Sequence, residues 1–311
     1  MLRYALGRIG QMVPIALLVT VLVFLLIKLL PGDPASAILG DRATDASITA
    51  LRRQWGLDLP IWQQYGLYMR NLLTGNLGIS LRYQSSVAAM LPARVAVTFF
   101  LVTFSLVLSV LIAVPLALVA AFHRNRWPDQ LIRAAMALPL AAPGFWVGIL
   151  LLILFALKLR WFPAMGYGDG LPDHVRHLFL PALTLSYAFA SVLCRNLRSS
   201  LVDAMSTAYV DFARAKGLRR RVVLFRHVFR AALLPAVTLI GARLSFAIGG
   251  AVVIETVFAI PGLGQWMVDS INARDYVVVQ TLTLMFALGT ILINLATDLL
   301  YPLFDPRLRM G

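Results

Sequence analysis

Residues 95–122 read VAVTFFLVTFSLVLSVLIAVPLALVAAF, a stretch without one charged side chain. A helix needs roughly 20 apolar residues to cross the hydrocarbon core of a bilayer, so this stretch predicts a membrane-spanning helix. Five further stretches meet or approach that length, at 11–30, 134–157, 178–194, 231–254 and 276–297. The sequence therefore predicts an all-α membrane protein with six transmembrane helices.

The composition supports this class. Hydrophobic residues make up 60% of the 311 residues and charged residues 14%, whereas soluble domains are near half apolar and a quarter charged. The formal charge of +14 favours retention of basic loops in the cytoplasm over nucleic-acid binding in a chain this apolar. The single cysteine, Cys194, excludes an intrachain disulfide and a cysteine metal cluster.

Orientation is predicted from the basic residues. Arginine and lysine concentrate in the N-terminal segment, in 122–133, in 195–230 and in the C-terminal segment, and they are sparse in the short loops 158–177 and 255–275. The positive-inside rule then places both termini in the cytoplasm. We expect an N-terminal end and an uncleaved first span over 1–30, a large extracytoplasmic loop over 31–94, a five-helix core over 95–301 that includes the cytoplasmic loop 195–230, and a tail over 302–311.

Motifs for catalysis are missing. A phosphate-binding loop needs the pattern G-x-x-x-x-G-K-[ST], and none of Lys28, Lys158 and Lys216 follows a glycine. We expect no enzyme activity and no cofactor in this chain, so that any energy from ATP comes from a partner. His174 and His177 could bind a divalent metal on an external loop, but Arg176 between them opposes a cation, and we interpret them as solvated loop histidines.

The loop 195–230 contains the most informative pattern. Four large apolar side chains recur at helical spacing, and they are Leu201, Met205, Tyr209 and Phe212. Ser206 or Thr207 is available as an N-cap, Gly217 as a C-cap, and the basic segment 219–221 follows. A short amphipathic helix, a glycine turn and a basic segment fit two interpretations equally: a knob that inserts into a groove on a soluble partner, or a basic loop that lies on anionic lipid.

The same segment resembles the coupling loop of binding-protein-dependent ABC permeases, in their dipeptide, oligopeptide and nickel branch. The residues of that resemblance are Tyr209, Val210, Asp211, Phe212, Ala213, Arg214, Ala215, Lys216, Gly217 and Leu218. The family pattern is Glu-Ala-Ala, three residues and then Gly; here Asp-Phe-Ala fills the first three positions. The Leu-Pro pair that follows in the family comes five residues later here, at 234–235.

Six further motifs extend the resemblance over nearly the whole chain. In order, they are LPGDP at 30–34, GLDLP at 56–60, GNLGIS at 75–80, LPALTL at 180–185, ETVFAIPGLG at 255–264 and ARDY at 273–276. The departures are single residues, such as Asn76 where the family usually has an acidic residue. Each motif is weak alone, but their order and spacing together favour this family.

The resemblance implies a type I importer fold in the bacterial inner membrane. It implies as partners a second homologous permease, two ATPase subunits that bind ATP and Mg, and an extracytoplasmic substrate-binding protein. The segment 211–217 would dock on an ATPase, and Arg219–Arg221 would brace it against the ATPase or lipid. Loop 31–94 and the turn at 261–264 would face the binding protein, unless that turn only connects two spans. Dipeptides, oligopeptides, glutathione-like peptides and nickel chelates all remain possible substrates.

Polar residues inside predicted spans are further candidates. Arg243, Asn294 and Asp298 could lie on the solute path or pair between subunits, and we favour pairing for Arg243. Two other classes compete with an importer permease. A secondary transporter driven by an ion gradient would show inverted repeats and buried acidic residues in its spans, and neither is evident. A membrane scaffold would use the loop 195–230 as an adaptor.

Overall fold

The computed structural model describes residues 2–29, 44–54, 56, 58–138, 142–219 and 222–304. Helices dominate this part of the chain, and the β pairing found there is an isolated bridge between Ile79 and Ser86. The long helices are α1 (Leu2–Leu29), α5 (Val87–Phe122), α9 (Leu171–Met205), α12 (Arg230–Val257) and α14 (Tyr276–Phe304). Among the described residues, four helices (α1, α5, α9 and α14) are long and apolar enough to cross a membrane. The all-α membrane fold is thereby confirmed.

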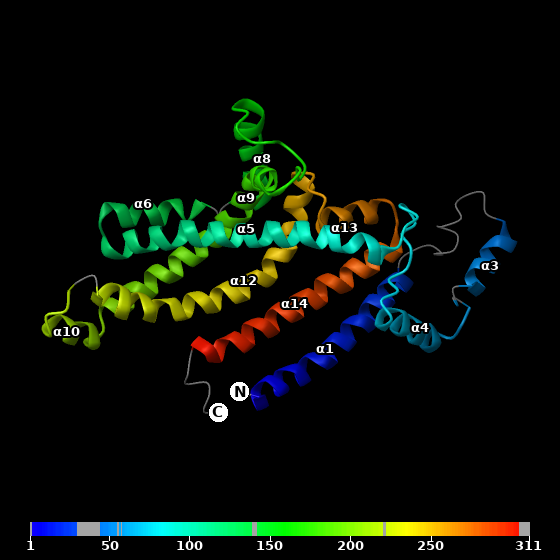
Figure 1. Ribbon diagram of the computed structural model, residues 1–311, viewed down its shortest axis with the longest axis horizontal. Coiled ribbons are helices and arrows are strands. Elements are labelled where there is room, and N and C mark those ends of the chain that lie inside the picture. Colours follow the sequence, from blue (N-terminus) through cyan, green and yellow to red (C-terminus); the bar gives the residue numbers. More distant parts are fainter. Residues whose placement is uncertain are drawn as a thin grey trace.

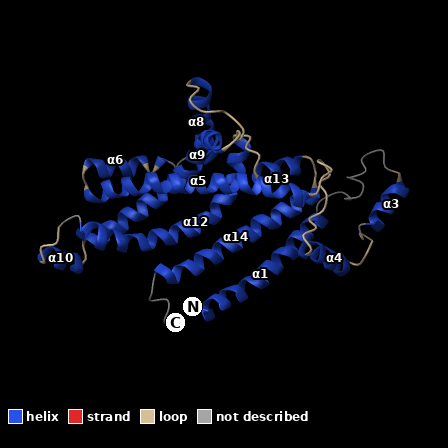
Figure 2. Cartoon of the chain, in the orientation of Figure 1, coloured by secondary structure: helices blue, strands red, loops and turns tan. Residues whose placement is uncertain are grey.

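Shorter helices join the long ones. They are α3 (Asp45–Gln54), α4 (Ile61–Leu73), α6 (Trp127–Ala135), α8 (Gly144–Leu151), the π-helical turn η1 (Leu152–Lys158), α10 (Ala208–Ala215), the π-helical η2 (Val223–Phe229) and α13 (Leu263–Asn272). Figure 2 shows that these short helices gather at the ends of the bundle and around its upper edge.

The third expected span differs from the structure. The sequence predicted one helix over 134–157, but α6 ends at Ala135 and the next apolar helix runs over Gly144–Lys158. Pro143 stands at the N-cap of α8. Its ring clashes with the preceding turn and it has no N–H to donate, so a helix begins after it more readily than it continues through it. The apolar run alone did not reveal this break.

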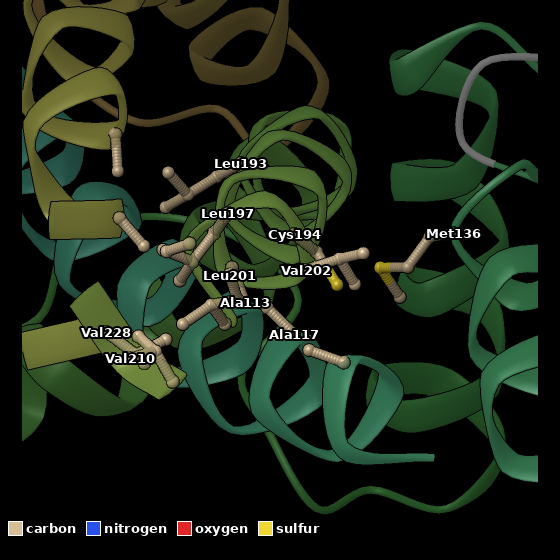
Figure 3. Packing of buried hydrophobic residues seen from close by; sticks show 14 of the residues in the cluster. Ala113, Ala117, Met136, Leu193, Cys194, Leu197, Leu201, Val202, Val210 and Val228 are labelled. Carbon is tan, nitrogen blue, oxygen red and sulfur yellow. The ribbon is translucent and has the colours of Figure 1, made fainter. Parts of the chain in front are cut away.

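The long helices pack as one bundle in which α5 lies against α9 and α12 lies against both α9 and α14 (Figure 1). Small side chains make the α5–α9 contact close: Ala113 and Ala117 on α5 are fully buried against Leu193 and Leu197 on α9 (Figure 3). Small residues at such a contact let two membrane helices approach and pack by van der Waals contact. The bundle core is therefore a helix–helix interface of alanine against leucine.

The start of α1 and the end of α14 lie near one another in Figure 1, as an even number of spans requires. The helices α6 and α10 lie toward one end of the bundle, and α3 and α4 lie toward the other. The two expected working surfaces, the segment 209–218 and the external loop, are thus at opposite ends.

Candidate functional site

The helix α10 is a short helix that is buried on one side and exposed on the other. On its inner side Val210 and Ala213 are 0% and 7% exposed, and they belong to the same apolar cluster as Val223 and Val228 (Figure 3). On its outer side Phe212 is 70% exposed. The inner residues attach α10 to the bundle, and the outer face leaves an aromatic side chain exposed.

A glycine turn ends α10, as the sequence predicted. Gly217 has a φ of +73°, a conformation that glycine adopts without steric cost. The N–H of Lys216 donates to the carbonyl of Phe212 at 3.0 Å, and the N–H of Leu218 reaches back to Ala213 at 3.3 Å. This bond from the residue after the glycine is the signature of a Schellman C-cap. The helix begins after Thr207, whose hydroxyl donates to the Ala204 carbonyl at 2.6 Å.

The other residues of the predicted coupling segment lie on or beside α10. Tyr209, Asp211, Ala215, Lys216 and Leu218 are all exposed. The side chain of Arg214 lies outside the described residues, as do Arg220 and Arg221, while Arg219 is exposed. The structure therefore gathers an aromatic and basic surface around the turn.

A buried ion pair joins α6 to α9 at the same end. Nε of Arg198 donates to Oδ1 of Asp129 at 2.6 Å, a second guanidinium nitrogen bonds Oδ2, and the backbone N–H of Asn125 donates to Oδ2 at 2.9 Å. Asp129 is fully buried, and its bond to Arg198 holds the pKa of its carboxyl below the usual range. Sequence analysis missed this pair. The one available signal was a lone acidic residue in the basic loop 122–133.

At the opposite end, a buried carboxylate organises the turn 261–264. Glu255 accepts from the Thr98 hydroxyl at 2.6 Å and from the backbone N–H groups of Gly264 at 2.6 Å and Gln265 at 3.2 Å. An anion at these groups stabilises the N-terminus of α13. A Cβ on Gly264 would lie 2.3 Å from the Cα of Val252. The turn is therefore a packed connector, with only Pro261 of its four residues exposed.

A second buried carboxylate ties the external loop to α14. Asp275 accepts from the Ser80 hydroxyl at 2.6 Å and from the N–H of Arg82 at 3.2 Å, although Ser80 lies 195 residues away in sequence. Gly78, with φ +85°, packs so tightly that a Cβ there would meet Val277 at 2.7 Å. Two of the sequence motifs, 75–80 and 273–276, thus form one contact.

Two of the three polar residues predicted inside spans have described side chains, and both lie on α14. Asp298 pairs with Arg8 of α1 at 3.3 Å, which links the two terminal helices. Asn294 is exposed on α14. Arg243 lies in α12, and its side chain is outside the described residues. Its predicted role in pairing stays a prediction.

The histidines at 174 and 177 correct an expectation. They lie in the first turns of α9 and not in a solvated loop, and the His174 ring stacks on Tyr167 with centroids 3.8 Å apart. His177 contacts the carbonyl of Asp173 at 2.9 Å. Within the described residues there is no group of three side chains able to hold a metal ion. The sequence did not show that Pro172 begins a helix here instead of excluding one.

Comparison with known proteins gives consistent matches. Residues 113–310 match the family described as binding-protein-dependent transport system inner membrane component, and residues 1–102 match its N-terminal family. The glutathione transport system permease protein GsiC of Salmonella paratyphi A is 41% identical over 309 residues, which cover 99% of both chains. Its Escherichia coli K12 counterpart is 40% identical over the same length and coverage. A crystal structure of an amino acid ABC transporter with histidines aligns with a TM-score of 0.51 at 13% identity, over 70% of this chain and 94% of that one, and so supports the fold alone.

Proposed function

The chain belongs to the family of binding-protein-dependent transport system inner membrane components and is an ABC importer permease, and from that premise we propose that it imports short peptides. We further propose that the ATPase drives transport through its contact with α10. The observation that supports the substrate class is the 41% identity to a glutathione permease over 309 residues, which cover 99% of both chains. We take glutathione as the first substrate to test.

A hollow in the middle of the bundle supports a path that tolerates different peptides. It has a volume of about 240 Å³ and lies between α5, α9 and α12. Its lining includes Ser105, Phe189 and Gly250, and none of the described lining residues is charged. An uncharged wall forms no ion pair with the termini of a peptide. We propose that selection occurs at the substrate-binding protein and that the permease passes what is delivered.

The helix α10 is proposed as the contact with the ATPase. Val210 and Ala213 attach it to η2 and α9, so a displacement of α10 moves the bundle with it. Phe212 projects from the opposite face, where an aromatic side chain can fill a groove as an interface anchor. Exposed Lys216 and Arg219 would surround that anchor with positive charge.

The partners and orientation complete the proposal. A permease of this family works with an ATPase and a substrate-binding protein; we propose a second homologous permease and two ATPase subunits, with ATP and Mg bound by the ATPases. Both termini would face the cytoplasm, on the side of α10. The external loop held by Asp275 through Ser80 and Arg82 would face the binding protein. An ion-gradient transporter has no support from the family match.

The test is ATP-dependent uptake in proteoliposomes that hold the full complex. Phe212→Ala removes the anchor from an exposed position, so we expect the complex to fold and uptake to fall by about tenfold or more, as for an interface hot spot. Phe99 on α5 is equally exposed at 70%, and Phe99→Ala is the matched control. Labelled glutathione, a dipeptide and a nickel chelate are compared in the wild type.

Two results would count against the proposal. Uptake by Phe212→Ala equal to that of Phe99→Ala would remove the role of α10. Uptake of the nickel chelate alone would keep the coupling and replace the substrate.

A further inference from the structure

A second and larger hollow lies between α6 and α9, near the end of the bundle that carries α10. Its volume is about 980 Å³, and its lining comes from 124–137 and 194–203. The inner part of the lining is apolar: Met136, Cys194 and Val202 are all buried members of one cluster, and Figure 3 shows Met136 beside the other two. The hollow plays no part in the coupling or solute path proposed above.

Its rim is strongly basic. Arg124, Arg133, Arg195 and Arg198 all line it. The charge of Arg198 is neutralised by Asp129, whereas the other three arginines are exposed and make no ion pair among the described residues. Asp203 is the one acidic residue among the described residues of the lining, so these residues carry a net positive charge.

Exposed apolar side chains stand at helical spacing from Ala134, a lining residue on the surface of α6. On α6, Trp127 is 75% exposed and Leu131 61%, and Leu138 just beyond the helix is 63% exposed. Tryptophan is enriched at the level of lipid headgroups, and leucine lies in the acyl region below. Arginine binds phosphate through charge-assisted hydrogen bonds. The combination of basic rim, apolar floor and apolar border matches an amphiphilic anion.

We propose that this hollow binds an anionic phospholipid, with its phosphate between Arg133 and Arg195 and an acyl chain beside Trp127 and Leu131. Basic pockets between membrane helices on the cytoplasmic side bind anionic headgroups. Inorganic phosphate or a nucleotide would use the rim alone, and the apolar floor and border would contribute nothing to it. The bound lipid would bridge α6 and α9 beside the Asp129–Arg198 pair, and this holds whichever solute is imported.

The test is native mass spectrometry of the full complex in detergent, with added phosphatidylglycerol or phosphatidylcholine of the same acyl chains. The wild type is expected to retain phosphatidylglycerol in preference. Arg133→Gln with Arg195→Gln should weaken this retention by about fivefold for each arginine removed, the effect of one basic residue near an anionic membrane surface. The control, Arg126→Gln with Arg176→Gln, removes the same charge from two exposed arginines outside the lining and should retain the lipid.

Three outcomes would overturn the proposal. Equal retention of the two lipids, or equal loss in the two double variants, would mean that the hollow does not select an anionic lipid. Displacement of phosphatidylglycerol by inorganic phosphate at millimolar concentration would assign the rim to a free anion. Arg133→Lys with Arg195→Lys keeps the charge and should retain most of the binding, so the proposal stays testable if the glutamine variant assembles poorly.

Discussion

Two short helices, α10 and α13, each join two long ones, and they lie at opposite ends of the bundle (Figure 1). The start of α13 is clamped by hydrogen bonds to buried Glu255, and its Trp266 is fully buried. The helix α10 is attached by two small apolar side chains, Val210 and Ala213, and leaves Phe212 exposed. The start of α13 is held by buried contacts within the chain, whereas α10 leaves an aromatic side chain exposed.

The difference shows how the fold divides its work. Hydrogen bonds to a buried charge are strong in a low-dielectric interior, and the Glu255 carboxylate accepts three, so the start of α13 is expected to be rigid. An exposed aromatic face gains from burial only when another protein covers it. The external end is therefore expected to stay rigid and act as a fixed frame. The α10 end is expected to provide the surface that a partner protein contacts and moves.

The largest effect is expected from breaking the frame. In Gly264→Ala the new methyl group would meet the backbone of Val252 and press on the Glu255 carboxylate. Overpacking of this kind costs about 3 kcal/mol at the upper end of its range, so we expect the melting temperature of the purified protein to fall by roughly 5–10 °C.

Gly249→Ala is the matched control, because nothing lies within 4 Å of a Cβ at that position in α12. Its melting temperature should equal or exceed that of the wild type, since alanine favours a helix more than glycine does. If Gly264→Ala were as stable as Gly249→Ala, the α13 end would not be a rigid frame.

A smaller loss is expected at the second carboxylate. Asp275→Asn keeps the shape of the side chain but removes the charge that accepts from Ser80 and Arg82. Hydrogen bonds to charged groups contribute about 1.5–3 kcal/mol, and we expect the free energy of unfolding to fall by about 2 kcal/mol. Asp269→Asn, on the neighbouring helix α13, serves as the control. Equal denaturation of the two variants would show that the external loop is not held by Asp275.

The fold class could be predicted from the sequence because membrane spans depend on local composition. Residues 95–122 lie within α5, and 276–297 lie within α14. The third span was placed too early because hydrophobicity continues through 134–138, beyond the end of α6, and a hydropathy pattern does not register where a helix stops. The proline at 143 was the physical signal, and it was outweighed by the apolar run.

The two candidate sites differ in how far sequence could reach them. The end of α10 was predictable because Gly217 determines a C-cap through its own backbone. The contact of Asp275 with Ser80 was not, although both lay in motifs that had been singled out, because no local rule pairs residues 195 positions apart. Glu255 likewise appeared as one more charge of an external loop, and its burial depends on the packing of α5 and α13 around it.

The smallest effect on stability is expected on α10 itself. Tyr209 is 43% exposed, and the helix is attached through its other face. Tyr209→Ala should therefore change the free energy of unfolding of the isolated chain by no more than about 0.5 kcal/mol, as surface substitutions do. The same variant should reduce the stimulation of ATPase activity by substrate-loaded binding protein in the assembled complex, because the lost ring belongs to the surface that we propose to be covered. A large loss of stability in the isolated chain would instead make Tyr209 part of the bundle, and the contrast between a closed α13 and an open α10 would weaken with it.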